Sequence, residues 1–131
     1  MAEIKISELS IGDWVKSLEK PMQVYWIEGK SVGMGTDNVI DYSCNVVEVA
    51  PIHLTPEILE KNGLEYVDDD NDAVIFLSCD LFWARLCVGD TFWRVGIHTE
   101  DKLDAVVCDV RAVHQLQHAL RLAGVEKEIE V

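Results

Sequence analysis

His114 and His118, four residues apart, are the first candidates for chemistry in this chain. On one helix face, this spacing suits a two-histidine metal clamp. A metalloprotease helix also needs a glutamate directly after the first histidine, because that carboxylate activates the metal-bound water. Gln115 stands there instead, and an amide cannot take a proton. The pattern therefore predicts two surface or interface histidines, not a catalytic zinc site.

Three aspartates in alternation, Asp68, Asp70 and Asp72, resemble the opening of an EF-hand loop. The sixth position of such a loop should be glycine and is Ala73, and the twelfth should be glutamate and is Cys79. Clustered carboxylates also suggest a metal-dependent hydrolase, but a nuclease surrounds them with basic residues that hold phosphate. We therefore expect a solvated turn and keep a metal-dependent hydrolase as the least favoured alternative.

The remaining catalytic motifs find little support. The four cysteines lie far apart without a C-x-x-C pair, which predicts buried, reduced thiols; they are Cys44, Cys79, Cys87 and Cys108. Phosphate-binding glycine loops and nucleophile elbows are missing from the sequence. We therefore predict a non-enzymatic protein with no catalytic residue, no cofactor and no metal.

Composition limits the partners. The chain has 131 residues, 49% of them hydrophobic, enough for one domain or two small units. Its formal net charge of −13 argues against direct nucleic-acid binding and leaves a basic partner or nucleic-acid mimicry open. A signal peptide is not recognisable, and no apolar run reaches the roughly 18 residues of a membrane span. We expect a cytoplasmic protein without a membrane partner.

One substantial helix is predicted from Val110 to Ala123, with Asp109 as its N-cap and Gly124 as its terminator. Its apolar residues fall within an arc of about 120° that should face a sheet. The main members of this arc are Val113, Leu116 and Leu120. The polar strip roughly opposite holds His114, Gln117, His118 and Arg121.

An antiparallel meander is predicted before this helix, from apolar runs separated by turn signals. The runs are Leu64–Val67, Ala73–Ser78, Leu81–Val88, Thr91–His98 and Ala105–Cys108. Gly89-Asp90 fits a two-residue hairpin loop, whose register pairs Phe82 with Ile97 and Ala84 with Val95 on the helix face. A two-turn helix is expected over Pro56–Asn62, and the alternating tail Lys127–Val131 predicts an added edge strand.

The other face of this hairpin carries Trp83, Arg85, Phe92 and Arg94. Two arginines opposite one another need a negative or aromatic neighbour, and Trp83 could give Arg94 a cation–π contact. A soluble protein seldom exposes so much aromatic area, so we expect this face to be covered by residues 1–50 or by a subunit. Together with the polar strip of the helix, it forms the candidate interaction surface, for an unknown protein partner or a second copy.

Residues 1–50 are expected to form a small β unit. Ile11-Gly12-Asp13-Trp14-Val15 is similar to the first turn of SH3-like barrels, and short strands with glycine corners need closure or a covering layer. The predicted class is α+β: an SH3-like unit over 1–50, then residues 51–131 with an antiparallel meander covered by one C-terminal helix. We expect the two parts to pack as one compact body.

Three segments together resemble a group of small uncharacterised proteins of gut anaerobic bacteria and their phages or mobile elements. They are Ile11-Gly12-Asp13-Trp14-Val15, the stretch from Pro51 to Gly63, and Val113-His114-Gln115-Leu116-Gln117-His118-Ala119-Leu120. The resemblance implies a shared fold and a bacterial cytosolic setting, and it transfers no catalytic residue. We therefore expect a binding or accessory protein, whose partner could be a second copy of the chain. The alternatives are an acidic nucleic-acid mimic that occupies a DNA-binding protein and the metal-dependent hydrolase described above.

Overall fold

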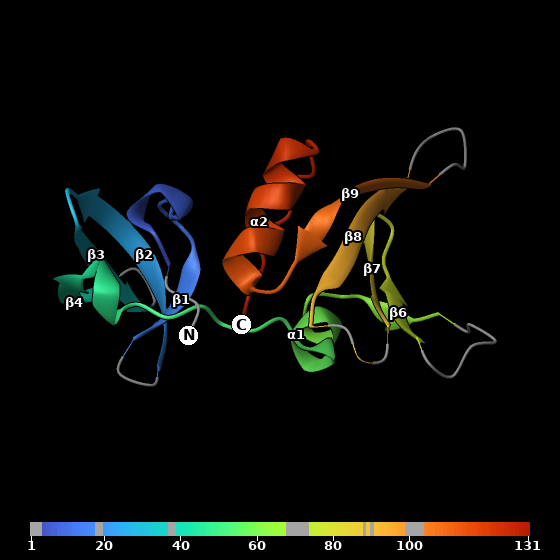
Figure 1. Cartoon of the computed structure of the whole chain (residues 1–131), viewed down its shortest axis with the longest axis horizontal. Coiled ribbons are helices and arrows are strands. Elements are labelled where there is room, and N and C mark those ends of the chain that lie inside the picture. The colour runs from blue at the N-terminus through green and yellow to red at the C-terminus, as the bar shows by residue number, and fades with distance from the viewer. Residues whose placement is uncertain are drawn as a thin grey trace. The chain divides into compact units, whose positions relative to one another are not determined.

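The computed structural model describes residues 4–17, 20–36, 39–67, 74–87, 89, 91–98 and 104–131. The chain divides into two compact units, Met1–His53 and Leu54–Val131 (Figure 1). Each contains one antiparallel sheet, and the C-terminal helix belongs to the second. The α+β class is therefore confirmed, and the packing of both units into one body stays a prediction.

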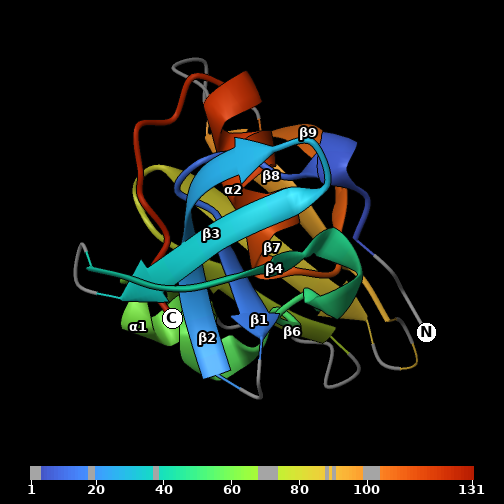
Figure 2. The same cartoon turned by 90° about the vertical axis from the view of Figure 1, so that its left-hand side faces the viewer.

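The first unit is a meander of four strands that pair in chain order (Figure 2). They are β1 (Trp14–Ser17), β2 (Lys20–Glu28), β3 (Ser31–Thr36) and β4 (Val39–Asn45). Burial alternates along β1, as expected for a strand with one face toward a core. Fully buried Val15, Val24, Val32 and Met34 form the centre of that core.

After β4 the chain makes a short 3₁₀ turn, Val46–Glu48, capped by Asn45. Lys16 and Ala50 then exchange two main-chain hydrogen bonds of 2.8 Å, so the segment after the turn returns to β1. Among the described residues the sheet does not close into a barrel. The SH3-like assignment is thus not confirmed and stays a prediction.

The second unit holds a five-stranded meander in chain order. Its strands are β5 (Glu65–Tyr66), β6 (Val74–Ser78), β7 (Phe82–Cys87), β8 (Trp93–His98) and β9 (Asp104–Val110). Phe82 pairs with Ile97 and Ala84 with Val95, so the predicted hairpin register is confirmed. These residues share the inner face with buried Leu77, whereas Trp83 points to the outer face.

Helix α2 (Val113–Leu122) lies beside β9 (Figure 1) and buries Val113, Leu116 and Leu120 as predicted. It begins three residues later than expected, because β9 continues to Val110 and therefore includes the proposed N-cap, Asp109. Gln115 folds back instead, and its Oε1 accepts from the main-chain N–H groups of Arg111 and Ala112.

Both helices end at a glycine with positive φ, as predicted. Helix α1 (Pro56–Lys61) starts with Thr55, whose Oγ1 accepts from the Ile58 N–H, and ends before Gly63. After α2, Gly124 has a φ of 80° and the Val125 N–H donates to the Leu120 carbonyl.

Each sheet also carries a tryptophan that lies across a glycine of the neighbouring strand. Trp26 on β2 pairs with Gly33 on β3, and Trp83 on β7 pairs with Gly96 on β8. A Cβ atom at either glycine would collide with the indole ring. The rings thus occupy the space that a side chain would need, which is the known use of an aromatic residue beside a strand glycine.

Candidate functional site

The outer face of the β5–β9 sheet gathers the unusual side chains of the second unit. Trp83 is only 6% exposed, because its ring lies on Gly96 and stacks on Phe76 with a centroid distance of 5.6 Å. Trp83 is thus buried by residues of its own sheet, and the covering of this face by residues 1–50 or by a subunit stays a prediction. Its Nε1 has no hydrogen-bond partner among the residues that the structure describes, which is costly for a buried donor.

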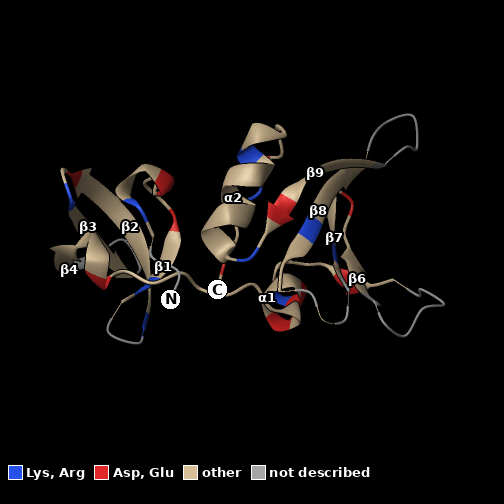
Figure 3. Ribbon diagram, in the orientation of Figure 1, with Lys and Arg blue, Asp and Glu red and all other residues tan. Residues whose placement is uncertain are grey.

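The two facing arginines lie on this surface as the register predicted. Arg85 pairs directly with Arg94, and both are exposed. The Arg94 Nε donates to Asp109 Oδ1 at 3.3 Å. Figure 3 shows basic colour on β8 and acidic colour on the neighbouring β9. Asp109 thus acts as a cross-strand partner for Arg94, which offsets part of the repulsion between the arginines. As a half-exposed pair it adds little stability.

Exposed apolar side chains occupy the same face. Val106 is 59% exposed and opposes Gly96 on β9, so it belongs to the Trp83 side of the sheet. Leu81 lies two residues before Trp83 and therefore on the same face. The Val67 N–H donates to the Phe76 carbonyl, which places Val67 opposite Phe76. The side chains of Leu81 and Val67 are each about half exposed. Phe92 is half-buried beyond the β7–β8 turn.

An open pocket of about 630 Å³ adjoins this face. Among the described residues it is lined by Gly63, Glu65, Tyr66, Val67, Ser78, Cys79, Asp80 and His98. Ser78 Oγ and His98 Nε2 share a hydrogen bond of 2.8 Å, the spacing of a nucleophile and its base. The Ser78 hydroxyl, however, also donates to the Cys79 carbonyl at 3.3 Å, and its one proton cannot serve both. The pair thus places two polar groups on the wall of the pocket.

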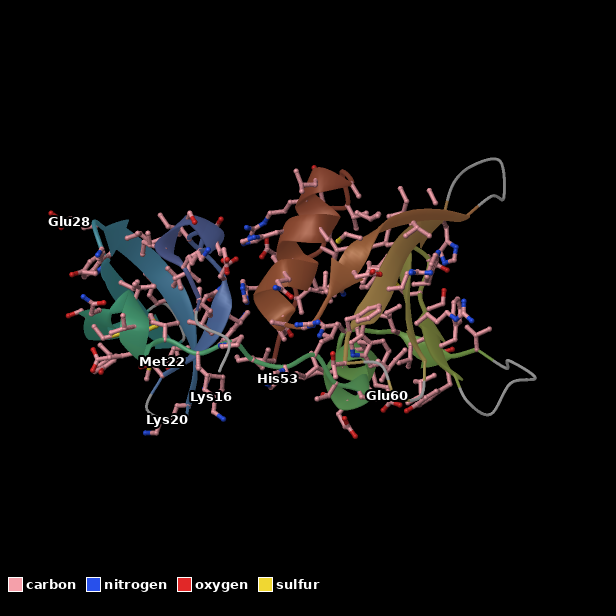
Figure 4. All side chains as sticks on the ribbon, in the orientation of Figure 1. Lys16, Lys20, Met22, Glu28, His53 and Glu60 are labelled. Atoms are coloured by element: carbon pink, nitrogen blue, oxygen red, sulfur yellow. The ribbon has the colours of Figure 1, made fainter. Side chains whose placement is uncertain are left out.

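Tyr66 forms the rim of this pocket. Desolvation and the carboxylates of Glu60 and Glu57 raise the pKa of its phenol. Figure 4 labels Glu60 on α1, next to this end of the sheet. Tyr66 therefore keeps its proton beyond the pH at which a free tyrosine loses it, and it remains a hydrogen-bond donor.

The polar strip of α2 differs from its expected exposure. His114 and Gln117 are buried, His118 is half-buried, and Arg121 is exposed with its Nη2 3.8 Å from Glu128 Oε2. The Gln117 amide bonds to the main chain of the C-terminal residues, which explains its burial. Because α2 lies on the inner side of the sheet, these residues do not join Trp83, Arg85, Phe92 and Arg94 in one surface.

Within the described part of the chain, no group of three or more potential metal ligands lies together. The rings of His114 and His118 lie 6.0 Å apart, edge to face. The aspartate run 68–72 lies outside the described residues. Gln115 is bound to the main chain, so it offers no replacement for a catalytic carboxylate.

We accordingly expect the untagged, chelator-free protein to carry far less than one equivalent of zinc, since its only paired histidines have an amide where the catalytic base belongs. Elemental analysis measures this directly. Near-stoichiometric zinc that disappears in His118→Ala would show the histidine prediction to be wrong.

The described thiols are free, as predicted for reduced cysteines, but their burial varies. Cys44 is buried, whereas Cys79 and Cys108 are half-buried; the Cys87 side chain lies outside the described residues. Desolvation raises the pKa of Cys44 and of Cys108, and Asp109 raises that of Cys108 further. Both thiols are therefore poorer nucleophiles at neutral pH than an ordinary cysteine.

The sequence interpretation missed the contact between Ser78 and His98 and the role of Asn62 described below. Ser78 ends β6 and His98 ends β8, and the register that brings Ser78 to this end of the sheet was not among the sequence predictions. Within the described part of the chain, no helix is long and apolar enough to cross a membrane. No family model, curated protein or solved structure matches this chain.

Proposed function

We propose that this chain is a non-enzymatic binding protein that docks a protein partner on the outer face of the β5–β9 sheet. The observation that carries the proposal is the exposed apolar set of Val67, Leu81 and Val106 around Trp83, with Arg85 and Arg94 beside it. An antiparallel sheet with one covered face normally presents polar residues on the other face. Tryptophan and arginine beside apolar residues are typical of interface centres.

The charges indicate the chemistry of the partner. Arg85 is exposed on this face, and Arg94 already has Asp109 beside it. A partner that brings a carboxylate to Arg85 and an apolar patch to Val106 would be complementary to both features. The bacterial cytoplasmic setting and the link to phages or mobile elements rest on the resemblance of the three sequence segments described first.

The test compares partner capture by the wild type and by Val106→Glu. The substitution places a charge in the exposed apolar set, so a partner that docks there should be lost, by at least roughly tenfold in recovered amount. Because Val106 is exposed, folding should change by no more than about 0.5 kcal/mol. Affinity capture from a gut anaerobe, with quantitative mass spectrometry and a thermal melt of each variant, measures both quantities.

Val47→Glu is the matched control, because Val47 is also a largely exposed valine and lies in the first unit. A partner retained by Val106→Glu and lost by Val47→Glu would contradict the proposed surface. If the captured partner is a second copy, sedimentation velocity should show a dimer that Val106→Glu weakens. A DNA-binding protein released by salt from all variants alike would instead support the acidic nucleic-acid mimic, which the net charge of −13 allows.

A further inference from the structure

The C-terminal tail (residues 125–131) is held in the manner of a bound peptide. Its residues Lys127–Val131 were predicted as an edge strand, but the structure assigns them no strand. Past Val125, its hydrogen bonds within the described part of the chain come from side chains of α1 and α2 and of the residue after α1. The prediction was wrong because side-chain amides, and not a neighbouring strand, satisfy the tail's main chain.

Two buried side-chain amides bind the main chain of the tail, and each donates one hydrogen bond to it and accepts one from it. Asn62, 5% exposed, donates to the Glu130 carbonyl and accepts from the Glu130 N–H, both at 2.8 Å. Gln117, 4% exposed, donates to the Lys127 carbonyl at 2.8 Å and accepts from the Ile129 N–H at 2.7 Å. A carboxamide carries the same donor and acceptor as a peptide group, so each replaces one strand partner.

The tail also has one buried apolar side chain beside these two amides. Ile129 is 1% exposed, whereas Glu128 and Glu130 on either side of it are exposed. Lys61 Nζ donates to the Val131 main-chain oxygen at 2.6 Å. The groove formed by Lys61, Asn62 and Gln117 therefore holds the tail through its main chain, and Ile129 is the tail side chain that is buried.

The connection to this segment is a tight turn. Helix α2 ends at Leu122, and Gly124, with its positive φ, turns the chain back toward Gln117. A change at this turn alone would carry the tail away from its own groove while leaving its sequence intact. Exchange of such a terminal segment between identical chains is a low-cost route to a dimer.

We propose that this groove, formed by Lys61, Asn62 and Gln117, is a peptide-binding site whose second occupant is the same tail from another copy of the chain. Each copy then fills the other's groove with the contacts seen here, and no new surface is required. The groove is separate from the outer sheet face, so failure of either proposal leaves the other standing.

Two full-length variants test the exchange. Ile129→Asp keeps the groove and removes the buried side chain of the tail. The double variant Asn62→Ala, Gln117→Ala keeps the tail and removes both side-chain amides that bind it. Neither variant by itself has both an intact groove and an intact tail. In a mixture, the groove of the Ile129→Asp variant can bind the intact tail of the other variant. We expect a mixed dimer in sedimentation velocity at high concentration, with at least a tenfold smaller amount in either variant by itself. No mixed dimer from two variants with native circular dichroism would overturn the proposal.

A second measurement covers the case in which either variant fails to fold. A protease site placed between Gly124 and Val125 allows the tail to be cut after folding. The nicked protein should exchange its tail for a fluorescent peptide of residues 125–131, and the same peptide with Ile129→Asp should bind at least roughly tenfold more weakly. Equal binding of both peptides, or none, would also overturn the proposal.

Discussion

Gly33→Ala should destabilise the first unit by about 1–3 kcal/mol, the usual cost of overpacking. The added methyl group would overlap the Trp26 indole, and its nearest neighbours all belong to that ring. In a Trp26→Ala background the same substitution should be neutral or stabilising by about 0.5–1 kcal/mol, because alanine costs less entropy in a strand than glycine. Urea denaturation followed by circular dichroism gives the four stabilities of this double-mutant cycle.

Gly96→Ala is the matched comparison in the second unit. A Cβ atom there would meet the Trp83 ring and, at 2.7 Å, the carbonyl oxygen of Ala105. Removing the ring leaves this main-chain clash, so Gly96→Ala should remain destabilising in a Trp83→Ala background. If Gly33→Ala and Gly96→Ala responded identically to loss of their tryptophans, the steric explanation would be incorrect.

Leu116→Ala should cost about 2–5 kcal/mol, because Leu116 is fully buried on α2 and its truncation leaves a cavity. Thermal and urea unfolding of the two proteins measure this difference. The loss should appear in the second unit, where the helix belongs.

The control for this substitution lies on the same helix. Leu122 is 88% exposed, so Leu122→Ala removes the same atoms from water-exposed positions and should change stability by less than about 0.5 kcal/mol. Similar losses for both substitutions would contradict the observed orientation of α2.

Local patterns predicted the second unit well. Alternation over 81–98 with the Gly89 turn determined both the face and the register of β7 and β8, because a shift of one residue would reverse every side chain. Thr55 and Gly124 marked helix ends through chemistry that acts within one turn. Asp109 failed as a cap because cross-strand pairing continued β9 through it, and this depends on residues distant in sequence.

The candidate site was predictable only in part. Trp83, Arg85 and Arg94 were assigned to one face by period-two alternation, and they share it. Gln117 was assigned to the polar strip of the helix, and its side chain indeed bonds to polar groups. Its burial was not predicted, because it depends on the C-terminal tail that returns to α2. Asn62 gave no sequence signal, because an amide after a short helix is also an ordinary solvent-facing residue.

The position of the tryptophans has an optical consequence. Trp14 and Trp26 lie in the first unit, and Trp83 and Trp93 in the second, so each sheet has its own fluorophores. Buried Trp83 and Trp93 should emit at short wavelength and shift to the red when water reaches them. With Trp14 and Trp26 replaced by phenylalanine, the emission would report on the second unit alone. If this emission and the circular dichroism of the whole chain change at the same temperature, the two halves of the chain melt in one step; separate midpoints would show two steps.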